Sequence, residues 1–462
     1  MELRNYQIDI IEKTRTLMRS GSKSILICAP TGSGKTILVA HMLKTAASRG
    51  MSSWFVCHRR ELISQSIRAF DQVGLKFGAI AAGFMEDRRP LAQICSIQTL
   101  TRRFHHYKKP RLVVWDETHH IAANSWDKVR KSQPDAYHIG LTATPIRLDS
   151  RGLDKWYGAM VNGPSVQWLI ENKFLAPYRL FAPGNVSMAG IHTRMGDYVK
   201  SELATALDKP TITGSAIKEY QRLAPGKRAV IFCVSIEHSK HVVSQFQAAG
   251  IPAAHVDGET NVDERDAAIK KFESGEIRVL SNVELFGEGF DLPAIEVAIL
   301  LRPTQSLGLY LQQVGRALRP SPGKTEAIIL DHAGNVQRHG LPDEERSWSL
   351  NGRDVRRKSD DDAGPSVRTC GKCFAVQPFG ATACKFCGTA FELKPREVKQ
   401  VDGDLTEVDI VALRAQQRQE QGLAKTMEEL VDLSKKRGHK RPYAWAKYVF
   451  NARQARKLAG LK

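Results

Sequence analysis

Two kinds of segment that would connect this chain to a membrane are missing from its sequence. The chain does not start with a charged and then apolar leader, and it has no uninterrupted apolar run of about 18 residues, the length that a membrane-spanning helix needs. Its 42% hydrophobic content is nevertheless sufficient for large buried cores. We therefore expect a soluble, intracellular protein without a membrane partner.

Negative charge is also scarce. The chain has 49 aspartates and glutamates against 68 lysines and arginines, which gives a formal net charge of +19, and no acidic residue follows Asp432. An excess of this size predicts attraction to a polyanion, of which nucleic acid is the simplest. A charged surface that only keeps the protein soluble is the alternative.

Cysteine is infrequent, and the eight cysteines fall into two groups. Four occur singly in apolar, strand-like runs, as expected of reduced core residues. They are Cys28, Cys57, Cys95 and Cys233. The other four form two Cys-x₂-Cys pairs with ten residues between the pairs: Cys370, Cys373, Cys384 and Cys387.

Paired cysteines with this spacing predict a tetrahedral Zn²⁺ site with four thiolate ligands. Gly371 and Gly388 suit the tight turns that such a site requires. Because the segment is too small to have much core of its own, bound zinc would supply its folding free energy. Thiols without a metal, a disulfide pair and an iron–sulfur cluster are the alternatives.

The length of 462 residues predicts about three domains. Short apolar runs alternate with helix-length segments, which is the pattern of βαβ units and parallel sheets, and the pattern occurs twice. The predicted fold class is α/β, with two parallel-sheet domains in tandem, a small cysteine module and a basic helical tail. The predicted boundaries are 1–180 and 205–345 for the α/β domains, 181–204 for a linker or insertion, 346–366 for a flexible connector, 367–392 for the cysteine module and 400–462 for the tail.

The stretch "APTGSGKT" at residues 29–36 lies between an apolar strand and a helical segment. A Gly-rich turn in this context lets backbone N–H groups and a helix N-terminus approach phosphate oxygens. Lys35 would reach the β- and γ-phosphates of a nucleotide, and the hydroxyl of Thr36 would bind Mg²⁺. The predicted nucleotide-binding residues are Thr31, Gly32, Ser33, Gly34, Lys35 and Thr36. The alternative is an ordinary Gly-rich connection, and Ala29 stands where the strict pattern has glycine.

A second motif, "VVWDETHH" at residues 113–120, ends an apolar strand with two adjacent carboxylates. Beside a phosphate loop, Asp116 would bind Mg²⁺, and Glu117 would orient and deprotonate a water near the γ-phosphate. A helix cap is the alternative, but a cap explains one acidic residue better than two. The pair therefore predicts a nucleotide hydrolase.

With these motifs, the sequence resembles the superfamily 2 helicases and translocases of the DEAD/DEAH type, over roughly residues 3–335. Asp116-Glu117-Thr118-His119 stands where the family has Asp-Glu-x-His, and Thr118 departs from the commoner Ala or Cys. The resemblance implies two RecA-like domains that hydrolyse ATP. In "LRNYQ", it implies adenine recognition by Tyr6 and Gln7.

Further motifs follow in the family's order. "CHRRELISQ" and "SIQTL" resemble the segments that contact the nucleic-acid backbone, through Arg60 and Thr99, and "LTATP" resembles the coupling motif with Thr142 and Thr144. "NVELFGEGFDLP" implies nucleotide contacts by Gly289 and Asp291. A solvated helix start and a plain strand-end turn are the alternatives for the first and third of these segments.

"YLQQVGRALRP" at residues 310–320 matches Gln-x-x-Gly-Arg-x-x-Arg through Gln312, Gly315, Arg316 and Arg319. The two arginines are three residues apart and share one helix face. Across an interdomain cleft they would neutralise charge that develops on the γ-phosphate. A solvated basic helix is the alternative.

The last segment, after Asp432, combines basic residues with aromatic ones, including Lys440, Arg441 and Trp445. Phosphate contacts and base stacking would use this combination. The alternative is a terminal helix whose aromatic residues form a buried stripe and whose basic face is solvated.

The cysteine cluster and "ILDHAGNVQRHG" at residues 329–340 are similar to RadD-like repair helicases and related phage-encoded helicases. The resemblance implies an ATP-dependent motor on DNA that uses ATP, Mg²⁺ and Zn²⁺, in the cytoplasm of a bacterial or phage-infected cell and close to the nucleoid. An RNA helicase, the motor of a restriction or remodelling system, and a zinc-dependent binding module with an inactive ATP site are the alternatives.

Overall fold

The computed structural model describes residues 2–147, 151–182, 193–194, 197–198, 210–283, 295–351, 367–378, 381–391, 419–437, 443, 445–447, 449–451 and 453. It consists of two compact units, Met1–Leu393 and Lys394–Lys462, and each is described by itself. No helix among the described residues has the length and apolar character needed to cross a membrane.

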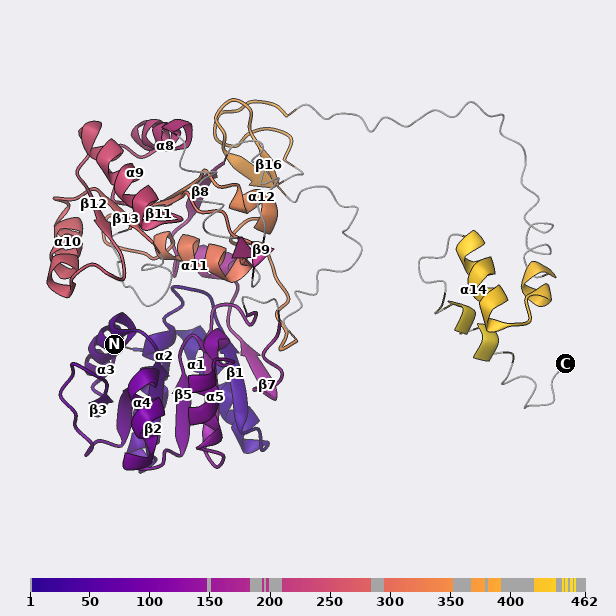
Figure 1. The fold of residues 1–462 in the computed structure, drawn as a ribbon, viewed down its shortest axis with the longest axis horizontal. Helices are drawn as coiled ribbons and strands as arrows, with labels where there is room; N and C mark the ends of the chain where they lie inside the picture. The colour runs from indigo at the N-terminus through magenta and orange to yellow at the C-terminus, as the bar shows by residue number, and fades with distance from the viewer. Residues whose placement is uncertain are drawn as a thin grey trace. The chain divides into compact units, whose positions relative to one another are not determined.

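Within the described part of the first unit, seven parallel strands form one sheet in the order β3-β4-β2-β5-β6-β1-β7 (Figure 1). The strands are β1 (Ser24–Cys28), β2 (Ser53–Cys57), β3 (Phe77–Ile80), β4 (Ala92–Ser96), β5 (Leu112–Trp115), β6 (Tyr137–Thr142) and β7 (Ala159–Asn162). Most of their residues are buried, as expected of a parallel sheet that is covered on both faces.

Helices cover both faces of this sheet. One face carries α1 (Asn5–Arg19), α2 (Lys35–Ser48) and α3 (Arg60–Val73), and the other carries α4 (Ile97–Arg103) and α5 (Asn124–Lys131). In β2, Phe55 and Cys57 belong to the apolar core under α1, α2 and α3, whereas Trp54 and Val56 belong to the core under α4 and α5. This alternation follows from the two-residue period of a strand.

A second parallel sheet has the order β12-β13-β11-β14-β15-β8 in the described residues. Its strands are β8 (Tyr178–Phe181), β11 (Ala229–Phe232), β12 (Ala253–Val256), β13 (Val279–Asn282), β14 (Val297–Leu300) and β15 (Ala327–Asp331). Its helices are α8 (Pro210–Leu223), α9 (Ile236–Ala248), α10 (Val262–Ser274), α11 (Leu307–Ala317) and α12 (Asn335–His339). The predicted pair of parallel-sheet α/β domains is therefore confirmed.

Short elements complete the first unit. They are η1 (Phe104–His106), η2 (Thr118–His120), α6 (Val166–Glu171), β9 (Thr193–Arg194), β10 (Asp197–Tyr198), β16 (Val367–Thr369) and β17 (Val376–Pro378). In the second unit, α14 (Met427–Lys436) contributes to a small apolar cluster with Leu430, Ala446 and Val449.

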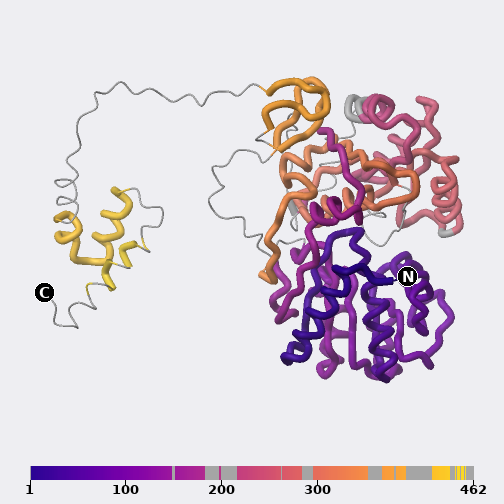
Figure 2. Tube along the Cα trace, turned by 180° about the vertical axis from the view of Figure 1, so that it is seen from behind, coloured from indigo at the N-terminus to yellow at the C-terminus, as the bar shows by residue number. Residues whose placement is uncertain are grey.

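The chain crosses between the two sheets at positions that the sequence did not reveal. β8 pairs with β15 of the second sheet, so the chain has left the first sheet before residue 180, which was predicted as the end of the first domain. After α12 the chain returns, and the N–H groups of Leu153 and Asp154 donate to the carbonyl of Leu350 at 2.7 and 3.1 Å (Figure 2). Leu350, within the segment predicted as a flexible connector, therefore contacts the first domain.

One buried histidine gives the first domain a defined response to acid. The Nε1–H of Trp115 donates to Nδ1 of His138 at 3.1 Å, and Nε2 of His138 lies 3.0 Å from the carbonyl of Gln133. Burial lowers the pKa of His138 from 6.5 to about 4. Since the folded pKa lies below the unfolded one, the stabilising contribution is present above pH 6.5 and is lost as the pH falls towards 4.

We expect the His138→Gln variant to lose less stability than wild type between pH 7 and pH 5. The difference should be about 2 kcal/mol in the free energy of unfolding, because each pKa unit corresponds to about 1.4 kcal/mol. Urea unfolding at both pH values measures it. The exposed His105 is the matched control, since His105→Gln should behave as wild type. An unchanged pH dependence in His138→Gln would contradict this assignment.

Candidate nucleotide-binding cleft

The phosphate loop joins β1 to α2, as the sequence predicted. In the structure the amine of Lys35 donates to the carbonyls of Ala29 and Pro30 at 3.0 and 3.3 Å, so it lies inside the loop. Gly32 and Gly34 have φ values of 85° and 75°, which favour glycine. The loop is therefore built to turn around a group at the N-terminus of α2.

The two residues proposed to recognise adenine lie against this loop. The hydroxyl of Tyr6 donates to the carbonyl of Ser33 at 2.8 Å. The amide Nε2 of Gln7 donates to the carbonyls of Ser33 and Gly34, each at 3.2 Å. A Cβ atom on Gly34 would lie 2.7 Å from that Nε2 atom, so a side chain at this position would displace the amide of Gln7, and the φ of 75° already favours glycine.

The adjacent carboxylates follow β5 at the same edge of the sheet. Asp116 and Glu117 are 6% and 9% exposed, and Oδ1 of Asp116 accepts a hydrogen bond from the N–H of Glu117 at 3.1 Å. Glu117 has a left-handed backbone conformation, with φ 46° and ψ 51°. For a residue with a side chain this costs on the order of 1–3 kcal/mol, and such strain is typical of functional sites.

Thr118, which stands where the family more commonly has Ala or Cys, has a buried hydrogen-bonding partner. Thr118 is fully buried, and its hydroxyl lies 2.5 Å from the hydroxyl of Tyr157. Tyr157 was not singled out by the sequence, because a tyrosine 39 residues away has no local signal that marks it as a partner. Oε2 of Glu117 also lies 3.5 Å from Nδ1 of His119.

Three ionisable groups influence one another at this edge. Burial, followed by the charge of Glu117, raises the pKa of Asp116 to about 7. Burial lowers the pKa of Lys35, and the charges of Glu117 and Asp116 oppose that shift. Buried carboxylates of this kind suit a divalent cation, which would favour their charged form.

The second domain contributes α11 to the opposite side of the cleft. A Cβ atom on Gly315 would lie 2.7 Å from Cβ of Thr31, so this helix packs directly on the phosphate loop. A Cβ atom on Gly32 would lie 3.5 Å from Cγ of Arg319, and the charge of Arg319 lowers the pKa of Lys35 further. Gln312 and Arg316 are buried on the same helix.

The coupling motif also touches α11. A Cβ atom on Gly308 would lie 2.8 Å from Oγ1 of Thr144. The hydroxyl of Thr142 donates to the carbonyl of Thr144 at 2.7 Å, and the N–H of Thr144 donates to Oγ1 of Thr142 at 3.2 Å. Both bonds lie within the motif itself.

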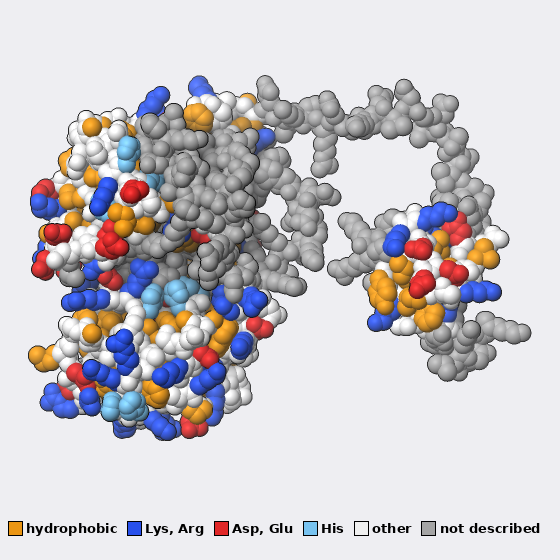
Figure 3. Space-filling view, viewed as in Figure 1, with side chains coloured by type: hydrophobic (Ala, Val, Ile, Leu, Met, Phe, Trp, Pro, Cys, Tyr) orange, Lys and Arg blue, Asp and Glu red, His pale blue; other side chains and the backbone are white. Residues whose placement is uncertain are grey.

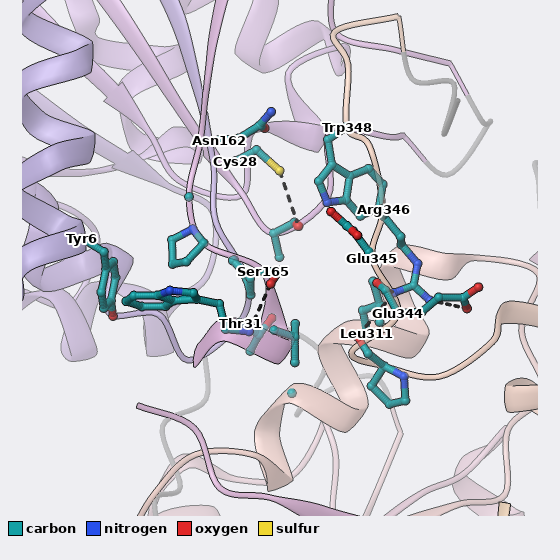
Figure 4. Close-up of a pocket in the computed structure, with 18 of the residues that line it drawn as sticks. Tyr6, Cys28, Thr31, Asn162, Ser165, Leu311, Glu344, Glu345, Arg346 and Trp348 are labelled. Atoms are coloured by element: carbon teal, nitrogen blue, oxygen red, sulfur yellow. Dashed lines mark hydrogen bonds and ion pairs between the residues drawn. The ribbon is translucent and has the colours of Figure 1, made fainter. Parts of the chain in front are cut away.

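A cavity of about 680 Å³ lies beside the phosphate loop, between the two domains (Figure 4). Pro30 and Thr31 line it on the loop side, with Tyr6 on α1 and Leu311 on α11. Trp348, from the segment that returns after α12, forms part of its wall in Figure 4. No sequence motif marks this tryptophan, because its position depends on the return of the chain.

Arg60 and Thr99 line a smaller cavity of about 310 Å³ on the first domain. The guanidinium of Arg60 lies 5.6 Å from the ring centre of Phe84. Next to it, Oε1 of Glu61 lies 2.9 Å from Nη2 of Arg265 on α10, and both side chains are mostly buried. The two segments predicted to contact a nucleic-acid backbone are therefore brought together, and an interdomain ion pair adjoins them.

Comparison with known proteins finds a matching family for the domain on each side of the cleft. Residues 1–147 match the family described as "Type III restriction enzyme, res subunit", and residues 213–321 match the "Helicase conserved C-terminal domain". A Lactococcus phage protein named only as "51.5 kDa protein" is 34% identical over 392 residues, which are 84% of each chain. The chain belongs to superfamily 2 of the helicases.

Other relatives of this superfamily 2 helicase carry functional names. The DNA 3'-5' translocase XPB2 of Sulfurisphaera tokodaii is 24% identical over 371 residues, 72% of this chain and 81% of that protein. The Saccharomyces cerevisiae protein named as ATP-dependent helicase IRC3 is 28% identical over 357 residues, 72% of this chain. The chain spans only 51% of that yeast protein.

Among solved structures, a fragment of an HsdR subunit of a type I restriction enzyme from Vibrio vulnificus has the same fold. It has a TM-score of 0.58 and 22% identity, and the match covers 76% of this chain and 67% of the other. The family models and the named relatives identify this superfamily 2 helicase as an ATP-hydrolysing helicase or translocase that works with a divalent cation.

The "DHAGN" segment of this helicase, for which the sequence offered no mechanism, holds the chain that leads into α11. The carboxylate of Asp331 accepts hydrogen bonds from the N–H groups of Ala333 and Val336 at 3.2 and 2.7 Å. The fully buried Asn335 accepts from the N–H of Thr304 and donates to the carbonyl of Arg302, both at 3.0 Å. This side chain fixes residues 302–304, just before α11 begins.

Lys324 fixes the other end of α11. Its amine donates to the carbonyl of Arg319 at 2.8 Å and to that of Ile295 at 2.7 Å, and it also contacts the carbonyl of Ala317. A cation at this position stabilises the C-terminus of a helix. Burial lowers the pKa of Lys324 to about 8. Helix α11, which carries Arg316, is therefore held at both ends, by Asn335 and by Lys324, and no sequence motif marked Lys324 for this role.

The four clustered cysteines of the helicase meet at one point. Their sulfur atoms all lie within 4.8 Å of one another, and the pairs Cys370–Cys387 and Cys373–Cys384 have Sγ–Sγ distances of 3.6 and 3.5 Å. Tetrahedral zinc with Zn–S bonds of about 2.3 Å separates its sulfur ligands by about 3.8 Å. The spacing is much longer than a disulfide bond of about 2.05 Å and fits a four-thiolate metal ion.

Some predicted contacts of the helicase with ligands lie outside the described residues: Gly289, Asp291, Lys440 and Arg441. Trp445 is described, and it packs against the apolar cluster that contains Leu430 and Ala446. The guanidinium of Arg437 lies 5.9 Å from its ring centre. These contacts favour the alternative in which part of the tail's aromatic content forms a buried stripe.

We expect Lys35→Ala to abolish ATP hydrolysis, because no other amine is placed inside the described phosphate loop. Lys44→Ala is the matched control, since Lys44 lies on the same helix and its amine bonds to the carbonyl of Val73 at 2.7 Å, away from the loop. Steady-state phosphate release measures both variants. Turnover at the wild-type rate in Lys35→Ala would remove this lysine from the site.

Proposed function

We propose that this helicase is a DNA-dependent motor in which ATP is hydrolysed between the phosphate loop and α11. The contact between Gly315 and Thr31 carries the proposal, because it places the arginine-bearing helix directly on the loop. A site assembled from both domains can convert a change in its occupant into a change in their separation. Movement along DNA and strand separation are both outputs of such a cycle.

The residues have distinct proposed roles. The loop residues Thr31–Thr36 hold the phosphates, with Lys35 at the β- and γ-phosphates, while Tyr6 and Gln7 contact the nucleoside. Asp116 and Thr36 hold the Mg²⁺ ion, which supplies charge neutralisation when it is bound. Glu117, mostly buried and beside His119, orients a water and takes its proton.

The arginines act from the other domain. Arg316 is buried in the last turn of α11, which ends at Ala317, and Arg319 follows the helix and lies against Gly32 of the loop. We assign to them the neutralisation of charge on the γ-phosphate, with Gln312 beside them as an organising residue. Thr142 and Thr144 then transmit a change in the occupancy of the nucleotide site to α11, because Thr144 contacts Gly308.

Nucleic acid is assigned to the face that carries Arg60 and Thr99. Lys and Arg side chains are spread over the side of the first domain shown in Figure 3, and the chain has a net charge of +19. Such a surface attracts a phosphate backbone irrespective of sequence. DNA is favoured over RNA because the relative XPB2 is named as a DNA translocase. The protein would accordingly act in the cytoplasm, at the genome.

The test of this function compares ATP hydrolysis by wild type and Glu117→Gln, alone and with single-stranded DNA, duplex DNA, forked DNA or RNA, at two salt concentrations. We expect DNA to stimulate wild type, and we expect the variant to show no stimulation. Stimulation should fall at the higher salt, because phosphate contacts weaken as counterions are added. Stimulation by RNA alone would establish an RNA helicase, and no hydrolysis in any condition would favour a binding module.

We also propose that the metal held by the cysteines is zinc. Hydrogen bonds from the hydroxyl and the N–H of Thr389 lower the pKa of Cys387 to about 6, whereas burial raises that of Cys373 to about 12. A bound cation would keep all four sulfurs as thiolates.

Metal analysis of protein purified without chelator should find one zinc per chain. Cys384→Ser should lower this value, because it removes one of four ligands, whereas Cys95→Ser, at a buried cysteine of the first sheet, should leave it at one. Iron in place of zinc, or no metal in wild type, would overturn the assignment.

A further inference from the structure

The cysteine module lies against the edge of the second sheet. Its strands β16 and β17 form a separate two-stranded ladder, and β8 is the edge strand of the six-stranded sheet in the described residues. Beside β8, Ala375 of the module forms an antiparallel bridge with Phe181. The N–H of Ala182 donates to the carbonyl of Phe374 at 3.1 Å. The module therefore continues the hydrogen bonding of the sheet beyond its last strand.

The metal-binding cysteines also belong to the core of the second domain. Cys370, Cys373 and Cys384 are 0%, 7% and 2% exposed, and they share one buried cluster with Phe181 of β8 and Tyr220 of α8. A module that worked as an independent appendage would keep its small core apart from the motor domain. Here the two cores are continuous.

Aromatic and charged side chains complete the contact. The rings of Phe386 and Phe181 meet edge to face, with centroids 5.4 Å apart and an interplanar angle of 83°. The guanidinium of Arg179, also on β8, lies 5.0 Å from the ring centre of Phe386. Nε of Arg179 donates to Oε2 of Glu326, just before β15, at 2.9 Å. Phe386 thus packs on two residues of the edge strand.

We propose that the cysteine module is a structural part of the second motor domain, and that its metal ion holds the edge strand β8 in place. The proposal rests on the proposed zinc site for the identity of the metal, but its docking contact is independent of that identity. β8 directly follows the segment that links the two sheets, so a loosened β8 would also loosen the start of the second domain. The module then supports ATP hydrolysis without contacting the nucleotide.

The chain offers a matched pair of phenylalanines for the test. Phe386 and Phe374 are both on the module and are 44% and 43% exposed, but only Phe386 has a described ring contact with β8. We expect Phe386→Ala in the full chain to lower the thermal unfolding midpoint by about 2–4 °C, with zinc content unchanged. Phe374→Ala should leave the midpoint within about 1 °C of wild type, because it removes none of the described ring contacts with β8.

Metal removal provides the second measurement. Chelation of the bound metal from wild type should increase amide hydrogen exchange in β8 and β15 while leaving β2 and β5 of the first sheet unchanged, and re-addition of zinc should restore protection. Equal midpoints for both phenylalanine variants, together with unchanged exchange in β8 after chelation, would overturn the proposal. If no metal is bound at all, the zinc assignment fails, and the phenylalanine pair alone decides whether the module is docked.

Should Phe386→Ala itself lose zinc, the exchange measurement in wild type decides. Increased exchange confined to residues 367–391 would show an independent module and sink the proposal. Increased exchange that extends into β8 would support it.

Discussion

The contact between Gly315 and Thr31 sets the geometry on which the rest of the cleft depends. Because a Cβ atom on Gly315 would lie 2.7 Å from Cβ of Thr31, any larger residue would force α11 away from the phosphate loop. The same approach brings Arg319 against Gly32 and Gly308 against Thr144. The absence of a side chain at Gly315 therefore allows the two halves of the site to meet. The charged side chain of Arg319 approaches the loop because of this close packing.

A close approach is useful only if the helix cannot slide. Asn335 holds the loop before α11, and Lys324 binds the carbonyls at its end. Both side chains form hydrogen bonds in buried surroundings, where a polar group left unpaired would cost about 1–3 kcal/mol. These bonds hold one short helix rigidly. The return of the chain near Leu350 connects the second domain to the first.

Sequence motifs predicted the fold class and placed the phosphate loop and the carboxylate pair at the ends of strands, because each motif is encoded within about ten neighbouring residues. Contacts between distant segments were beyond their reach. The sequence of Tyr178–Phe181 does not indicate which sheet the strand joins, and the contact between Thr118 and Tyr157 joins residues that are 39 positions apart. The position of Trp348 depends likewise on the path of the chain. The roles of the individual site residues remain predictions.

The place of β8 has a consequence for dividing the protein into fragments. A second domain cut at residue 205 would lack its edge strand, and the N–H and C=O groups of β15 that pair with β8 would be left unsatisfied. A free parallel edge invites pairing with other chains and aggregation. A fragment that keeps this edge paired would begin ahead of Tyr178, and on our proposal it would continue through the cysteine module.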